Sequence, residues 1–324
     1  MSPPAHDLVR IMSSKIILSD DLRSYLDRLP DVELDLLLEA YERPLPEAFR
    51  VNTLKASEEK ILERLRSRGY SIEPIPWARH GYMASGGEDL GKSLEHMLGL
   101  IYIQGPVSMA PVEALDPRPG EVILDLCAAP GSKSTQIAQL LRGEGVLVAN
   151  DISFDRVKAL SSNLQRFGVL NCVITLADGR KYPRFAREFF DKVLVDAPCS
   201  SLGIISKNWG IARAWSIGIV KRLSELQKRL ILAAFDCLKP GGTLVYSTCT
   251  LTVEENELVV NWLLENREDA KVSEIRLKDL RHRPGITEYG GVRMKDEISK
   301  TMRIMPYDNW AEGFYIARIM KEVR

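Results

Sequence analysis

The 324-residue sequence has no excess of either charge sign, since Lys plus Arg and Asp plus Glu each number 44. A protein-wide positive field is therefore excluded, and any contact with a polyanion needs a local cluster of cations. Long apolar runs are also missing. The N-terminal stretch MSPPAHDLVRIMSSKIILSD has no continuous apolar core, and no run approaches membrane-spanning length. These absences predict a cytoplasmic protein that does not enter a membrane.

Cysteine and histidine are scarce. Five cysteines without a CxxC pair do not form a disulfide framework, and four histidines provide no zinc-ligand spacing, so we expect no metal. Cys172 and Cys237 are interpreted as small buried hydrophobes, and Cys127 is expected to pack in a turn. Cys199 and Cys249 differ, because each follows a strand-like run, in DAPCSS and YSTCT. They could be packing residues, metal ligands, a redox pair or two parts of one covalent mechanism.

The first third of the chain has the pattern of a small α+β domain. Apolar spacing predicts a helix over residues 20–42. The next elements are the strand AFRVNTLK, a helix over SEEKILERLRSRG, the strands SIEPIP and HGYMA, a helix at 91–97 and a strand at 100–103. This order is typical of a ferredoxin-like, RNA-recognition-like domain. We therefore expect a helical segment over residues 1–46 and an RNA-binding α+β domain over residues 47–105.

From residue 106 the pattern changes to buried strands alternating with helices. The runs EVILDLC, GVLVAND, CVITLADG, DKVLVDAPC and TLVYSTCT are almost wholly apolar, and helices are predicted at 132–142, 154–167, 217–238 and 252–266. This alternation indicates an α/β fold with a doubly wound, mostly parallel sheet. Residues 106–324 are therefore expected to form one Rossmann-like domain.

Ligands of such sheets bind outside the carboxyl ends of the strands. The turn in LDLCAAPGSKS can present free backbone N–H groups, but it lacks both the GxGxxG and the GK[ST] pattern. Asp151 ends the next strand, 20 residues after Gly131 (151 − 131), where a carboxylate can reach a ribose, and Asp178 ends the third. Each acid could instead cap the following helix or turn. Together they favour a nucleoside with a carboxylate-bearing tail, and S-adenosylmethionine (SAM) is the natural candidate.

A cysteine beside a methyl donor suits a carbon that is not nucleophilic by itself. Carbon 5 of cytosine becomes nucleophilic after a thiolate adds at carbon 6, and loss of the carbon-5 proton then releases the enzyme. A nearby acid that protonates or hydrogen-bonds the ring nitrogen would assist the addition, and Asp196 is placed for that role. An enzyme that methylates an exocyclic amine would instead carry an Asn-Pro-Pro-aromatic motif where this chain has DAPC.

In order, the motifs QGPVSMAPVEAL, LDLCAAPGSKS, DAPCS, YSTCTL and GFYIARI resemble the NOL/NOP/Sun group of SAM-dependent RNA cytosine-5 methyltransferases, and FRVNTLK is similar to that group's N-terminal signature. The resemblance implies that Cys249 is the nucleophile and that Cys199 helps expel the methylated product. DNA cytosine-5 methyltransferases use the cysteine equivalent to Cys199 as nucleophile, so that assignment stays open. Asp196 would contact the cytosine, and Lys133 would lie near donor and base. The implied SAM site comprises Cys127, Ala128, Ala129, Pro130, Gly131, Lys133, Asp151, Arg156, Asp178 and Asp196.

Three positions depart from the family pattern: Ser132 replaces a glycine, SKNWG replaces RKNPD but keeps Lys207, and Tyr307 replaces a histidine. Ser132 should be tolerated if its φ is negative. A monomer is expected, with RNA as its partner. The absence of a charged tail favours tRNA, with ribosomal RNA or a non-catalytic RNA-binding role as alternatives. Candidate RNA-contacting cations are Arg50, Lys55, Arg64, Arg66, Arg68, Lys221, Arg222, Arg281 and Arg283, although a solvated surface explains most of them equally well.

Overall fold

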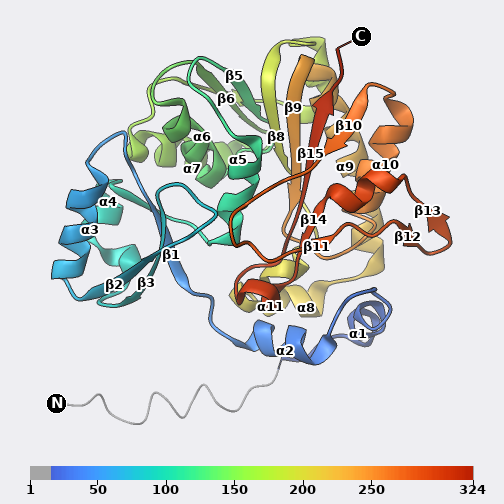
Figure 1. Cartoon of the computed structure of the whole chain (residues 1–324), viewed down its shortest axis with the longest axis horizontal. Helices are drawn as coiled ribbons and strands as arrows, with labels where there is room; N and C mark the ends of the chain where they lie inside the picture. The colour runs from blue at the N-terminus through green and yellow to red at the C-terminus, as the bar shows by residue number, and fades with distance from the viewer. Residues whose placement is uncertain (1–15, 324) are drawn as a thin grey trace.

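The computed structural model describes residues 16–323, which form a four-stranded sheet, a nine-stranded sheet and a two-stranded ribbon. In Figure 1 the four-stranded sheet lies at the left and the nine-stranded sheet occupies the centre and right. Residues 1–15, which belong to the predicted N-terminal segment, lie outside the described residues. The α/β fold with a smaller N-terminal α+β domain confirms the predicted fold class.

The smaller sheet is antiparallel, with the order β2-β3-β1-β4. Its strands are β1 (Glu47–Val51), β2 (Tyr70–Pro74), β3 (Gly81–Gly86) and β4 (Ile101–Ile103). Helix α3 (Glu58–Ser67) packs Ile61 and Leu65 against Phe49, and Gly69 follows it with a φ of 88°. The strand order is that of a ferredoxin-like fold. The single helix predicted at 91–97 is wrong: Ser93 is extended and separates a 3₁₀ turn, Leu90–Lys92, from α4 (Leu94–Met97).

The larger sheet has the order β11-β14-β15-β9-β8-β5-β6-β7, and β10 pairs with β15. Its parallel part consists of β5 (Val122–Asp125), β6 (Val146–Asp151), β7 (Cys172–Leu176), β8 (Phe190–Asp196) and β9 (Leu238–Thr248). An antiparallel part follows, which the sequence had not indicated: β10 (Ala270–Ser273), β11 (Arg283–Pro284), β14 (Met302–Ile304) and β15 (Phe314–Lys321). The separate ribbon pairs β12 (Glu288–Tyr289) with β13 (Val292–Arg293).

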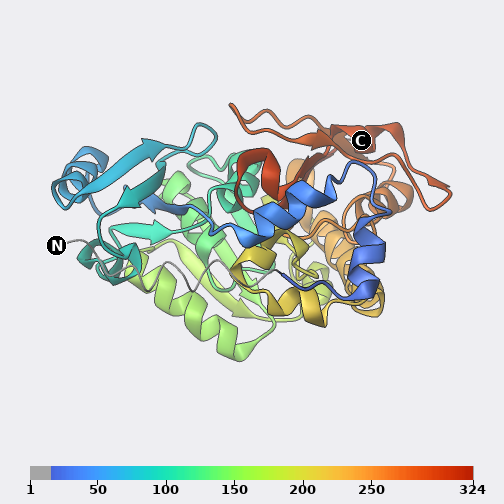
Figure 2. The same cartoon turned by 90° about the horizontal axis from the view of Figure 1, so that it is seen from below.

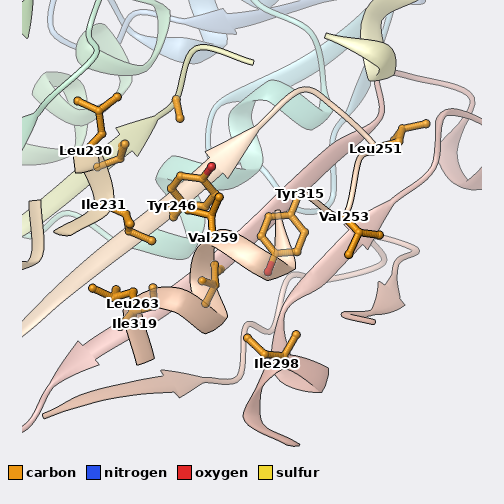
Figure 3. Packing of buried hydrophobic residues seen from close by; sticks show 14 of the residues in the cluster. Leu230, Ile231, Tyr246, Leu251, Val253, Val259, Leu263, Ile298, Tyr315 and Ile319 are labelled. Atoms are coloured by element: carbon orange, nitrogen blue, oxygen red, sulfur yellow. The ribbon is translucent and has the colours of Figure 1, made fainter. Parts of the chain in front are cut away.

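Helices cover both faces of this sheet, as the apolar strands predicted. Helices α5 (Ala110–Leu115), α6 (Ser132–Leu141) and α7 (Phe154–Phe167) share one hydrophobic cluster with Leu194. On the other face lie α8 (Gly210–Ala214), α9 (Ile217–Cys237) and α10 (Glu257–Asn266). Figure 3 shows this second cluster, where Ile231 of α9 and Val259 of α10 pack near Tyr246 of β9. The parallel strands are thereby packed between two layers of helices.

Two predicted helices have different limits. The continuous helix predicted over residues 20–42 is wrong, because the chain breaks between α1 (Asp20–Leu26) and α2 (Leu34–Glu42). Pro30 lacks an N–H group and Asp31 has a φ of 64°, so neither continues a helix. The helix predicted at 252–266 begins only at Glu257.

The N-terminal helices pack against the larger domain. Leu22, Leu37 and Tyr41 belong to the same hydrophobic cluster as Tyr246. Figure 2 shows α2 beside α11 (Pro306–Asn309), a contact that brings the start of the described chain against its last quarter.

Candidate functional site

A cavity of about 450 Å³ opens at the carboxyl ends of the parallel strands. It is lined by residues at or after the ends of β5, β6, β7, β8 and β9 and by the face of α9 that carries Leu226 and Leu230. Of the predicted site residues, the cavity brings together Cys127, Ala129, Asp151, Arg156, Asp178, Asp196, Cys199 and Cys249. Ala128, Pro130 and Lys133 line a small adjoining pocket that shares Cys127, Ala129 and Asp196 with it.

The turn after β5 leads directly into α6. Gly131 is the N-cap of this helix with a φ of 110°, a backbone conformation that favours glycine. Ser132 is the first helical residue and its φ is not positive. The predicted condition for tolerating serine at this position is therefore met. The turn is braced from α7, because Asn163 Nδ2 donates to Pro130 O at 2.9 Å and Arg156 donates to Ala129 O. The free N–H groups at the start of α6 are thus held beside the cavity.

The two acids at the strand ends already have protein partners. Asp151 is buried, accepts from Ser153 N at 3.0 Å and lies 3.1 Å from Arg156. Asp178 accepts from Arg180 N at 3.1 Å, capping a 3₁₀ helix, and is also ion-paired with the Arg180 side chain at 2.7 Å. The Arg180 side chain holds the pKa of Asp178 below its usual range. The capping alternative therefore applies to both acids, and both residues also line the cavity.

Lys133 and Asp196 form an ion pair between the turn and the end of β8. Lys133 Nζ lies 2.7 Å from Asp196 Oδ2, and Ser247 Oγ donates to Asp196 Oδ1 at 2.8 Å. Burial disfavours the ammonium charge, but Asp196 outweighs burial and raises the pKa of Lys133. Lys133 is therefore a cation at the cavity wall.

The two cysteines at strand ends are in contact. Cys199 Sγ and Cys249 Sγ lie 3.3 Å apart, both are free thiols, and Ser201 Oγ lies 3.6 Å from Cys249 Sγ. Their pKa values shift in opposite directions. The hydrogen bond with Cys199 lowers the pKa of Cys249 despite its burial, whereas the hydrogen bond with Cys249 and then burial raise that of Cys199. The arrangement favours a thiolate at Cys249 and a protonated thiol at Cys199.

Four polar residues at the site were not predicted from the sequence: Asp125, Ser108, Ser201 and Ser247. Asp125 is buried and accepts from Ser134 Oγ at 2.7 Å, while Ser108 lies 3.4 Å from Lys133 Nζ. All four lie within the motifs quoted above, and Ser201 and Ser247 are each two residues from a strand-end cysteine, in DAPCSS and YSTCTL.

The cavity fits a nucleoside-bearing cofactor such as SAM. It combines apolar walls from Leu226 and Leu230 with carboxylates at two strand ends, and its volume lies within the ordinary range for cofactor sites. Across residues 16–323, no group of three or more His, Cys, Asp or Glu side chains could hold a metal ion. Within the same range, every helix is too short or too polar to cross a bilayer.

Several cations proposed for RNA contact have structural roles instead. Arg50 is fully buried and binds Thr135 and Gln139 of α6, so its assignment to an RNA surface is wrong. Arg64 and Arg68 both pair with the buried carboxylate of Glu95. The other cations in contact with protein groups are Lys55, which donates to Leu98 O and Arg166 O, and Arg283, which pairs with Glu33 and Asp308.

Two family models match the chain: 16S rRNA methyltransferase RsmB/F over residues 112–320, and the N-terminal domain of 16S rRNA methyltransferase RsmF over residues 20–106. A tRNA (cytosine(49)-C(5))-methyltransferase from Pyrococcus abyssi is 48% identical over 281 residues, covering 86% of this chain and 89% of that relative. Ribosomal RNA small subunit methyltransferase F from Vibrio parahaemolyticus is 41% identical over 90% of this chain, which spans 60% of that relative.

Solved structures agree in fold. A methyltransferase homologue from Pyrococcus horikoshii is 36% identical, with a TM-score of 0.82 and 98% of each chain covered. NSun6 from Pyrococcus horikoshii, solved with the SAM analogue SFG, is 25% identical with a TM-score of 0.82, over 96% of this chain and all of that one.

Proposed function

Because the chain belongs to the RsmB/F family of SAM-dependent RNA methyltransferases, we propose that it methylates carbon 5 of a cytosine in tRNA through a transient covalent bond to Cys249. The observation that carries this proposal is the pair of thiols 3.3 Å apart at the cavity, with the pKa of Cys249 lowered and that of Cys199 raised. An N-methyltransferase has no use for such a pair. A redox function has no other support among the cavity residues.

Each step assigns one role to one side chain. The Cys249 thiolate adds to carbon 6, and the electrons of the 5,6 double bond move toward the ring nitrogen and make carbon 5 nucleophilic. Asp196, held by Lys133 at 2.7 Å and by Ser247, would in its protonated form give its proton to that ring nitrogen, and the resulting carboxylate would keep its pairing with Lys133. After methyl transfer a base removes the carbon-5 proton, the double bond reforms, the ring nitrogen returns its proton to Asp196 and the Cys249 sulfur leaves as thiolate. The Cys199 thiol, already hydrogen-bonded to that sulfur, assists this departure.

The residues around the cavity would hold SAM in a definite order. Asp151, fixed by Ser153 and Arg156, would accept the ribose hydroxyls, and Asp178 would accept from the adenine amino group. The start of α6 offers N–H groups to the carboxylate of the tail. When bound there, SAM supplies the electrophilic methyl group.

The choice of tRNA rests on the relative whose name specifies it, because that protein is 48% identical and 89% covered. Ribosomal RNA is the second candidate. The Vibrio relative named for it aligns with 90% of this chain, although the chain spans only 60% of that protein. A monomeric state and a cytoplasmic location stay predictions. Bisulfite sequencing of total RNA from a deletion strain would identify the modified molecule and position together.

Alanine substitutions of the two cysteines test the mechanism. Cys249→Ala should abolish methyl transfer and any RNA adduct, because the nucleophile is gone. Cys199→Ala should accumulate a protein–RNA adduct that survives denaturing electrophoresis, because release is slowed. Exchanged phenotypes would reverse the roles of the cysteines. Activity surviving both substitutions would exclude covalent catalysis, and mass spectrometry showing the methyl group on nitrogen would favour an exocyclic N-methyltransferase. Intact RNA binding without methyl transfer by the wild type would indicate a non-catalytic relative.

A further inference from the structure

The carboxylate of Glu255 lies fully buried between the loops that carry the two cysteines, and no step above uses it. Its Oε1 accepts from Ser200 N at 2.9 Å and from Gln227 Nε2 at 3.0 Å. Its Oε2 accepts from Thr252 Oγ1 at 2.8 Å and from the Ser200 hydroxyl. A buried carboxylate with four donors is stabilised as the charged form. It is therefore a carboxyl group that these donors hold in place inside the protein.

These contacts fasten both cysteine loops to one group. Ser200 follows Cys199, and its hydroxyl also lies 2.8 Å from Thr250 Oγ1, next to Cys249. On the other side, Gln227 Nε2 donates to Pro198 O at 2.8 Å as well as to Glu255. The peptide of Cys199 is thus held before and after the thiol.

Taking the covalent mechanism proposed above as its premise, we propose that Glu255 is a positioning residue that sets the separation of the two thiols and keeps the proton on Cys199, so that Cys249 is the nucleophile. A negative charge opposes ionisation of a nearby thiol. A Glu255 charge adds to the hydrogen bond with Cys249 and to burial in raising the pKa of Cys199. For Cys249 the charges with the largest effect are instead those of Asp196, which raises its pKa, and Lys133, which lowers it.

The other titratable group near Cys199 does not compete with Glu255. Burial raises the pKa of Tyr246 well above its ordinary value, so this phenol stays neutral, and its hydroxyl donates to Glu255 O at 2.6 Å. Burial also raises the pKa of Glu255, while the donors from Ser200, Thr252 and Gln227 lower it. The donors thus favour the charged form of Glu255 against the larger effect of burial.

The test compares Glu255→Gln with Glu254→Gln. Glu254 is the adjacent residue, and its carboxylate contacts Tyr25 and Tyr289 rather than either cysteine loop. Each protein, without RNA, is labelled with iodoacetamide between pH 6 and 9, and alkylation of each cysteine is followed by mass spectrometry. In wild type and Glu254→Gln, Cys249 should react about tenfold faster than Cys199 at pH 7, since one pKa unit changes the thiolate fraction about tenfold. In Glu255→Gln this preference should fall to about threefold or less, with methyl transfer reduced at least tenfold.

A second variant separates charge from tethering and guards against misfolding of the first. Ser200→Ala removes the hydroxyl between Glu255 and Thr250 but leaves the charge, so methyl transfer should slow about tenfold while the labelling preference persists. Wild-type labelling and turnover in Glu255→Gln would overturn the proposal, as would unchanged turnover in Ser200→Ala. Because labelling needs no RNA, its outcome is distinct from a failure of the proposed function, which would appear as methyl transfer by Cys249→Ala.

Discussion

At the carboxyl ends of the parallel strands, the pKa of a side chain depends on its burial and on the group that it contacts. Lys133 keeps its charge because Asp196 is 2.7 Å away, and Cys249 has a lowered pKa because of its hydrogen bond with Cys199. Asp125 has no cationic partner, since it accepts only from Ser134 and its Oδ1 is unpaired. Burial, opposed by the Ser134 hydrogen bond, raises the pKa of Asp125 to about 7. This carboxyl therefore titrates close to physiological pH.

We predict that Asp125→Asn makes stability less dependent on pH. Between pH 4 and 7 folded Asp125 holds a proton that the unfolded chain has lost, so wild-type stability falls as pH rises through this window, by up to about 1.4 kcal/mol per unit. Asparagine removes this loss. The unfolding free energy of the variant relative to wild type, from urea titrations, should rise by about 2–4 kcal/mol from pH 5 to pH 8. A difference that is constant across pH would show that Asp125 is ionised throughout.

The residues that the sequence could identify are those at a strand end with an unusual side chain. Asp151, Asp196, Cys199 and Cys249 stand where an apolar run stops, and parallel strands bring such positions to one edge. Glu255 could not be identified, because a glutamate in VEENE looks like part of a solvated surface. Its burial follows from packing between two loops that are far apart in the chain.

At the scale of elements, β1 and α6 are joined by a buried arginine. Arg50 donates to Thr135 Oγ1 at 2.9 Å and to Ser132 O at 3.2 Å, and it also binds Gln139. Burial lowers the pKa of Arg50 to about 9. The FRVNTLK motif also provides Asn52, whose Nδ2 donates to Phe167 O at 2.7 Å at the end of α7. The motif therefore connects the smaller domain to the helix that carries Lys133.

We predict that Arg50→Met destabilises the protein by about 2–4 kcal/mol, because it leaves buried acceptors on α6 without donors. Urea unfolding measures the loss. The matched control is Arg66→Met, at an exposed position on α3, which should change stability by less than about 0.5 kcal/mol. Equal effects of the two substitutions would mean that the hydrogen bonds of Arg50 do not contribute to the stability of the protein.

Element types followed from the sequence more readily than their ends or partners. Continuous apolar runs identified the parallel strands, and α7 has the predicted limits, Phe154–Phe167. The antiparallel β14 and β15 were missed as strands, because their register depends on β9, which is distant in sequence. The late start of α10 at Glu257 follows from contacts of Glu255 with the other cysteine loop. Local pattern carries no information about such contacts.

At the scale of the whole molecule, zero net charge means that RNA affinity must come from one surface. Exposed cations follow one another along α8 and α9: Arg213, Lys221, Arg222 and Arg229. Helix α9 also lines the cavity through Leu226, which lies between Arg222 and Arg229 on the helix. A phosphate backbone bound there would bring a flipped cytosine to Cys249.

We predict that replacing Lys221, Arg222 and Arg229 with glutamine weakens tRNA binding and reduces its salt dependence. Each phosphate contact contributes about 0.7–0.9 to the slope of log Kd against log salt, so losing three contacts should reduce the slope by about 2–3. Fluorescence anisotropy with a tRNA transcript from 50 to 300 mM salt measures it. The control replaces Lys271, Arg276 and Arg293, which change the net charge equally but lie within 4.0 Å of carboxylates. If both triple variants lower the slope equally, total charge governs binding and the α9 surface has no special role.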